Sequence, residues 1–134
     1  MFLDTPIWKF IFEALKPERD SKKLVRLASE DIDECEFRTI CRDHGILLIV
    51  NESIKEVAQH IFSVTGLEAW RSAVAASTLH SLEMHRELQK LTRLFDKAGL
   101  PVVPFKGPRL SDRLYGDPLL KMSADLDLLV SREH

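Results

Sequence analysis

The sequence predicts an α+β protein in which a mostly helical region, residues 1–100, leads through a long helix into a small sheet within residues 101–134. Three observations predict this class. Apolar residues recur at three- and four-residue steps through much of the first hundred residues. Gly99 and Pro101 then end the helical pattern. Two short apolar runs follow, separated by a glycine turn. The two regions can also form one compact domain.

Composition limits the classes of function. The chain has 134 residues, 45% hydrophobic and 30% charged, which fits one soluble globular domain. A net charge of −2 argues against bulk binding to nucleic acid or to an anionic membrane, both of which favour a basic surface. No stretch approaches the ~18 apolar residues of a membrane span, and the start lacks the basic residues of a signal peptide. We therefore expect a cytoplasmic protein.

Four helices are predicted before the long one. Pro6 follows a capping residue and begins the first, which ends near Pro17. Residues 24–28 fit a short amphipathic helix. Residues 29–44 are acidic early and basic late, the polarity that a helix dipole favours, and Gly45 ends them. Residues 46–61 continue in helical order. Two cysteines, at positions 35 and 41, are expected to be reduced residues of the third helix.

The long helix is predicted from Leu67 to Ala98. Its apolar stripe, with Ser77 and Ser81 in the same register, contains Trp70, Val74, Met84, Leu88, Leu91, Phe95 and Ala98, and is widened by Leu79, Leu82 and Leu94. We expect this stripe to pack in a core, the alternative being a self-associating seam. His80 and His85 point about 140° apart on a helix, so they cannot bind one ion together.

The stretch after the long helix carries the predicted chemistry. Residues 102–105 read as a strand that ends at Lys106-Gly107, and Pro108 suits the first turn of a helix. Gly107 permits positive φ or a close approach of another group. Because a helix N-terminus attracts anions, a lysine beside it indicates a phosphate site.

A second predicted strand, within residues 123–130, carries two aspartates. Strand alternation places Asp125 and Asp127 on one face, about 7 Å apart along the backbone, and Leu126, Leu128 and Val130 on the other. Two carboxylates this close repel each other unless a cation joins them, which indicates a divalent metal. The alternative is an exposed strand end whose aspartates face water.

Several motifs in order carry a family resemblance. They are Phe105-Lys106-Gly107, Leu110, Leu114-Tyr115-Gly116-Asp117-Pro118, Lys121, Ser123 and Asp125-Leu126-Asp127-Leu128-Leu129-Val130. Together they resemble the signature of a bacterial nucleotidyltransferase family of the DNA polymerase β type, although Lys121 stands where that family is expected to have arginine. The resemblance covers roughly the last quarter of the chain and implies the start of a small polymerase-β-like sheet.

The resemblance also implies an activity. Asp125 and Asp127 would be catalytic and would hold Mg²⁺, while Lys106, Gly107, Arg109 and Ser123 would bind the nucleotide phosphates. The substrate would be an NTP, with ATP expected, and an acceptor hydroxyl of unstated identity would displace pyrophosphate. Such transferases usually take a third carboxylate from a later strand, so we expect this sequence to carry only part of the catalytic core.

Two other classes of function stay open at this point. One is a catalytically inactive nucleotide-binding protein that keeps the phosphate site. The other is a helical protein-interaction module whose C-terminal part serves only to pack. Homo-oligomers could form through the long helix or through the exposed edge of the sheet.

Overall fold

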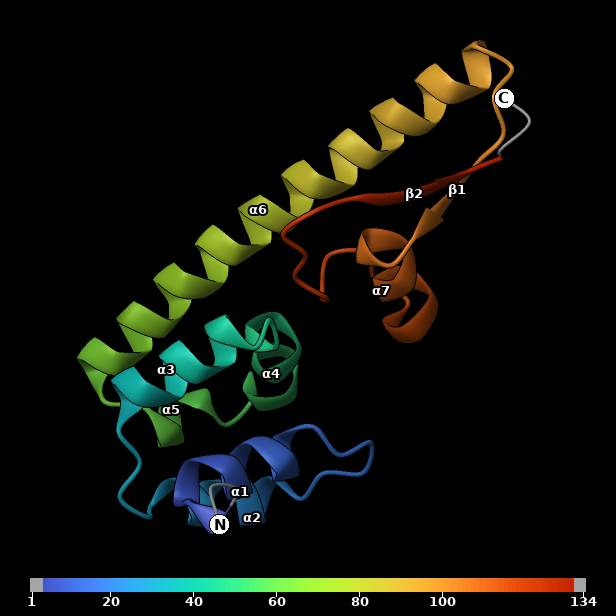
Figure 1. Ribbon diagram of the computed structural model, residues 1–134. Coiled ribbons are helices and arrows are strands. Elements are labelled where there is room, and N and C mark those ends of the chain that lie inside the picture. Colours follow the sequence, from blue (N-terminus) through green and yellow to red (C-terminus); the bar gives the residue numbers. More distant parts are fainter. Residues whose placement is uncertain (1–3, 132–134) are drawn as a thin grey trace. The chain divides into compact units, whose positions relative to one another are not determined.

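A computed structural model describes residues 4–131 of the chain. The elements are α1 (Pro6–Ala14), α2 (Ser21–Ala28), α3 (Glu34–Asp43), α4 (Leu47–Ile54), α5 (Ala58–Ile61), α6 (Val64–Lys97), β1 (Val102–Phe105), α7 (Gly107–Tyr115) and β2 (Asp127–Val130) (Figure 1). The α+β class and the long helix are confirmed. The chain divides into two compact units, Met1–Ala75 and Ala76–His134, and α6 contributes to both. The two units are defined by contacts between residues. The predicted regions 1–100 and 101–134 are defined by their type of secondary structure, so the two divisions describe different properties of the chain.

Aromatic rings form the core of the first unit. The Phe37 ring stacks on Trp70 with centroids 5.2 Å apart and meets Phe10 edge-on at 5.3 Å. Phe62 stacks on Trp70 at 5.1 Å. These rings come from α1, α3, the segment before α6, and α6, so one buried cluster joins elements far apart in sequence.

A buried carboxylate links α1 to α2. Glu13 is 5% exposed, and its Oε2 lies 2.8 Å from Lys16 Nζ and 2.7 Å from Lys23 Nζ. Hydrogen bonds from these two ammonium groups lower the pKa of Glu13 to about 2. The charge of Glu13 is therefore stabilised although water barely reaches it.

Two predicted helix boundaries were wrong. The third helix begins at Glu34 rather than near residue 29, because the side chain of Asp33 accepts a hydrogen bond from the Glu36 amide at 2.8 Å and caps the helix there. The single helix predicted over residues 46–61 is two helices, α4 and α5. The Val57 amide bonds to the Ile54 carbonyl at 2.9 Å, an i to i+3 bond that interrupts the α-helical ladder between them.

The start of α6 depends on Glu34 in α3. Glu34 accepts hydrogen bonds from the amide of Ser63 at 2.7 Å and from its hydroxyl at 2.9 Å. The Ser63 hydroxyl in turn accepts from the Gly66 amide at 3.0 Å. The helix therefore begins at Val64, slightly earlier than the predicted Leu67.

The second unit packs a two-stranded sheet and α7 with the later part of α6. The strands β1 and β2 are antiparallel, with Val102 opposite Val130 and Phe105 opposite Asp127. Ser77, Ser81 and Leu88 of the predicted stripe are buried. Leu79 and Leu94 are 57% and 54% exposed, so the buried stripe is narrower than predicted. Among residues 4–131, no helix combines the length and the apolar character that crossing a membrane requires.

Candidate functional site

The turn after β1 has an unusual backbone. Lys106 has φ 64° and ψ −154°, and it is the one non-glycine residue with positive φ within residues 4–131. This conformation is favourable for glycine and strained for a residue with a Cβ. Gly107 follows with φ 53° and is the first residue of α7. Strand β1 therefore gives way to α7 within two residues, and the N-terminus of α7 lies at this turn.

Gly107 packs against the segment that precedes β2. A Cβ at this position would lie 3.7 Å from Ser123 Oγ, 3.9 Å from the Asp125 carbonyl oxygen and 3.9 Å from Leu126 Cδ2. Gly107 itself is buried. The predicted phosphate turn and the predicted acidic segment are therefore in close proximity.

One ion pair joins the two parts of the site. Lys106 Nζ lies 3.2 Å from Asp127 Oδ2. The pairing of Phe105 with Asp127 brings these residues together, since Asp127 is the first residue of β2 and Lys106 directly follows β1. The ammonium group of Lys106 also lies 5.3 Å from the centroid of the Phe105 ring.

Asp125 is not on a strand, which corrects the sequence analysis. Strand β2 begins at Asp127, and Asp125 is an exposed residue of the bend before it. The alternation that placed both carboxylates on one strand face therefore does not apply. The reason is tertiary, because the Lys106-Gly107 turn ends β1 opposite Asp127 and residues 123–126 pack around Gly107 instead of extending the ladder. Val130, expected on the apolar face, is 56% exposed.

Ser123 is held by α6. Its backbone carbonyl oxygen lies 2.9 Å from His80 Nε2. Its hydroxyl oxygen is buried and has no hydrogen-bond partner among the described residues. A buried hydroxyl without a partner is costly, and a ligand could bond to this oxygen only if the segment beside Gly107 moved.

Arg109 lies in the first turn of α7. Its side chain is 67% exposed, and its guanidinium lies 3.9 Å from the Asp112 carboxylate, so only a weak contact holds it. Arg109 also lines a cavity of about 310 Å³ together with His85, Leu88, Pro108, Asp112 and Pro118. The side chain of this predicted phosphate ligand is therefore exposed at the first turn of α7.

Sequence reasoning missed Ser111. This fully buried hydroxyl of α7 donates to the Asp117 carbonyl at 2.6 Å and accepts from the Lys121 amide at 2.9 Å. It fixes the turn between α7 and the acidic segment. The sequence did contain a signal for the burial of Ser111. It lies four residues after Gly107, on the same face of α7 as the buried Gly107 and Pro108.

The site offers two carboxylates as possible ligands for Mg²⁺, those of Asp125 and Asp127. The described part of the chain contains no group of three or more His, Cys, Asp or Glu side chains that could hold a metal ion. Mg²⁺ usually binds one or two carboxylates together with substrate phosphates and waters. Asp125 and Asp127 supply two carboxylates, which is the number that an ion shared with a substrate would need.

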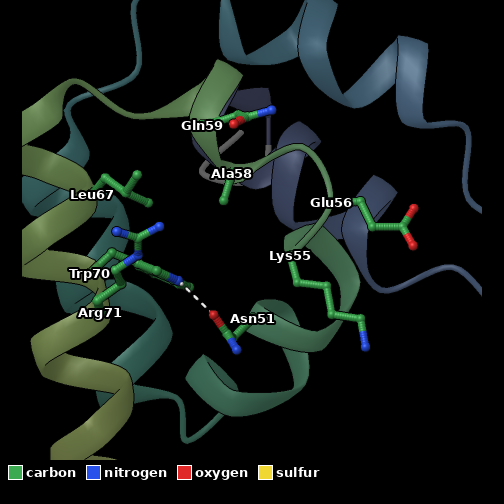
Figure 2. Close-up of a pocket in the computed structure, with 8 residues that line it drawn as sticks. All are labelled: Asn51, Lys55, Glu56, Ala58, Gln59, Leu67, Trp70 and Arg71. Carbon is green, nitrogen blue, oxygen red and sulfur yellow. Dashed lines mark hydrogen bonds between the residues drawn. The ribbon is translucent and has the colours of Figure 1, made fainter.

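A separate cavity of about 280 Å³ lies in the first unit, and Figure 2 shows its lining. Trp70 Nε1 donates a hydrogen bond to Asn51 Oδ1 at 2.9 Å at this cavity. Its other lining residues are Lys55, Glu56, Ala58, Gln59, Leu67 and Arg71. None of the residues predicted for catalysis or phosphate binding lies there.

The comparisons with known proteins support a nucleotidyltransferase family. Searches of curated proteins and of solved structures gave no match. A family model described as uncharacterised nucleotidyltransferase matches residues 30–134, a range that includes the Lys106-Gly107 turn, Ser123 and both aspartates. On this match, which covers most of the sequence, the chain belongs to the uncharacterised nucleotidyltransferase family.

Proposed function

We propose that this chain carries part of the catalytic core of a Mg²⁺-dependent nucleotidyltransferase. The enzyme would move a nucleoside monophosphate from an NTP, with ATP as the expected donor, to an acceptor hydroxyl. One observation carries the proposal: Lys106 Nζ lies 3.2 Å from Asp127 Oδ2, at the N-terminus of α7, in a chain of a nucleotidyltransferase family. A group that attracts phosphate and a group that attracts a cation therefore meet at one place.

The phosphate side of the site consists of cations and backbone amides. Lys106 and Arg109 supply positive charge, and the first turn of α7 presents amide N–H groups that lack partners within the helix. The buried hydroxyl of Ser123 would supply a donor once the segment beside Gly107 moves. These groups would bind the triphosphate and orient its α-phosphorus for in-line attack.

The acidic side would serve the acceptor. The acceptor hydroxyl gives up its proton to water and its oxygen forms a bond to the α-phosphorus, while the bond from that phosphorus to the bridging oxygen breaks and pyrophosphate leaves. Mg²⁺, when bound, neutralises phosphate charge and lowers the pKa of the acceptor hydroxyl. Asp125 and Asp127 would provide its protein ligands. We place this reaction in the cytoplasm as part of the same proposal, because both cysteines are free thiols.

A second candidate is nucleotide binding without transfer. The ion pair with Lys106 occupies one of the two aspartates that would bind metal. A site in which that pair persists would bind phosphate less tightly and would hold Mg²⁺ through Asp125 alone. The two candidates make different predictions for the fate of an α-phosphate label.

Transfer is tested with NTPs labelled at the α-phosphate, each incubated with the protein, Mg²⁺ and a cell extract as the source of acceptors. We expect label to move to an acceptor and Asp127→Asn to reduce this transfer by about a hundred-fold or more. Asp96→Asn, at an exposed position near the end of α6, is the matched control. Circular dichroism checks that each variant is folded.

The results separate the candidates. Transfer that survives Asp127→Asn rules out the proposed mechanism. ATP binding by the wild-type protein without any label transfer selects the binding role. Absence of both ATP binding and transfer rejects both candidates and favours the helical interaction module.

A further inference from the structure

The backbone of Lys106 calls for an explanation. A residue with φ near +60° and extended ψ is ordinarily glycine, because a Cβ in this region is strained. The next residue, Gly107, is itself a glycine, so this turn already contains one residue that adopts positive φ without strain. A lysine stands at this strained position, and an interaction of its side chain would offset the strain.

The contacts of Lys106 in the structure are weak. Its side chain is 59% exposed, and the Asp127 side chain, its partner at 3.2 Å, is 39% exposed. An ion pair as exposed to solvent as this one changes a folding or binding equilibrium constant by at most about five-fold. The contact with the Phe105 ring is of a similar, modest kind. A divalent cation or a phosphate can therefore replace either partner.

We propose that Lys106 is the resting counter-ion of Asp127 and that the two residues exchange partners when substrate binds. In this inference, which rests on the proposed function, Lys106 turns to the triphosphate as Asp127 turns to Mg²⁺. Both exchanges keep each charge neutralised, because the ammonium gains phosphate oxygens and the carboxylate gains a cation.

The exchange has a consequence for metal binding alone. Mg²⁺ that binds without nucleotide must displace Lys106 from Asp127, and the displaced ammonium gains no new partner. Lys106 thus weakens the binding of free Mg²⁺ and strengthens the binding of the nucleotide. Removing the ammonium must shift these two affinities in opposite directions, whereas loss of fold would weaken both.

The test measures both affinities by NMR titration of the folded protein at constant ionic strength. MgCl₂ is titrated without nucleotide while the amides of residues 125–128 are followed, and ATP is titrated in EDTA while the amides of residues 107, 109 and 110 are followed. For Lys106→Met we expect Mg²⁺ to bind about two- to five-fold more tightly and ATP to bind about five-fold or more weakly. Lys106→Gln serves as a second variant with a polar side chain.

Arg113→Met is the matched control. Arg113 is an exposed residue near the end of α7, so its removal changes the net charge equally without touching the ion pair. Screening by salt should keep its effect on Mg²⁺ affinity below about two-fold. Opposite shifts that are confined to the Lys106 variants support the exchange. Unchanged or weaker Mg²⁺ binding in Lys106→Met, or equal tightening in Arg113→Met, overturns it.

The exchange and the transferase proposal can fail separately. Opposite shifts without transfer of an α-phosphate label would remove the transferase and leave the exchange in place. Label transfer that depends on Asp127 without opposite shifts would remove the exchange and leave the transferase.

Discussion

His80 Nε2 lies 2.9 Å from the backbone carbonyl oxygen of Ser123. Because a carbonyl oxygen only accepts hydrogen bonds, Nε2 must carry the hydrogen and donate it. The bond joins α6 to the segment that packs against Gly107. His80 therefore positions the acidic side of the candidate site without being part of it.

Replacing His80 should loosen this segment. We expect His80→Phe to lower the free energy of unfolding by about 1 kcal/mol and to broaden or shift the amide resonances of residues 121–127. Chemical denaturation and NMR spectra measure the two effects. His60→Phe is the control, since His60 is exposed and its Nε2 lies 3.4 Å from the side chain of its neighbour Gln59, away from residues 121–127 in the sequence. Unchanged resonances at residues 121–127 in His80→Phe would contradict this role.

The strain at Lys106 can be measured with a pair of variants. Lys106→Gly and Lys106→Ala remove the same charge, but only glycine relieves the backbone conformation at φ 64°. We expect the free energy of unfolding of Lys106→Gly to be about 1 kcal/mol higher than that of Lys106→Ala. The same pair at Arg109, inside α7, should show the opposite order, because glycine destabilises helices. An alanine variant at position 106 as stable as the glycine variant would mean that the turn is unstrained.

Ser111 should contribute to stability because its hydroxyl both donates and accepts a hydrogen bond. Ser111→Ala removes the bond to the Asp117 carbonyl and leaves the Lys121 amide without its acceptor. We expect a loss of about 1–3 kcal/mol in the free energy of unfolding. The control is Ser81→Ala, since the buried hydroxyl of Ser81 has no partner among residues 4–131. Equal losses in the two variants would contradict the importance of these bonds.

Local sequence signals predicted α6 well except at its start. The apolar pattern predicted a start at Leu67, whereas α6 begins at Val64. In the structure the Glu34 carboxylate occupies the space that a Cβ of Gly66 would fill, and Ser63 caps the helix. That partner comes from α3, about thirty positions earlier, and no local pattern contains it.

The candidate site shows the same division between local and tertiary information. The sequence predicted a strand that ends at Lys106-Gly107 and a second strand that carries Asp127, and the antiparallel register of these strands brings the two residues together. The position of Asp125 did not follow from the sequence, because strand alternation presumes a strand that reaches it. Packing of Ser123 and Leu126 around Gly107 ends the ladder at Asp127 instead.

The two cysteines should differ strongly in reactivity. Cys41 is fully buried in α3, and burial raises the pKa of its thiol to about 12, so roughly one part in ten thousand is thiolate at pH 8. Cys35 is exposed on the same helix. We expect iodoacetamide to modify Cys35 in the folded protein and Cys41 only after unfolding. Mass spectrometry of wild-type protein and of Cys35→Ser follows the two rates; comparable rates would show that Cys41 is accessible.

Glu13 should make stability depend on pH in the acid range. Its pKa is about 2 in the folded protein, against an ordinary value of 4.5, because Lys16 and Lys23 donate hydrogen bonds to its carboxylate. A lowered folded-state pKa adds stability that is complete above about 4.5 and is lost as the pH falls toward 2. The partner Lys16 has a raised pKa, so the same pair also weakens at pH values above the ordinary lysine pKa of 10.5.

We therefore expect the free energy of unfolding to rise between pH 2 and pH 4.5 and to rise less in Glu13→Gln, which keeps the shape of the side chain but not its charge. Urea denaturation at several pH values measures it, and the fluorescence of buried Trp70 reports unfolding of the first unit. Glu18→Gln, at an exposed position after α1, is the matched control and should keep the wild-type dependence on pH. Equal slopes in the wild-type protein and in Glu13→Gln would show that this carboxylate does not link α1 to α2 through its charge.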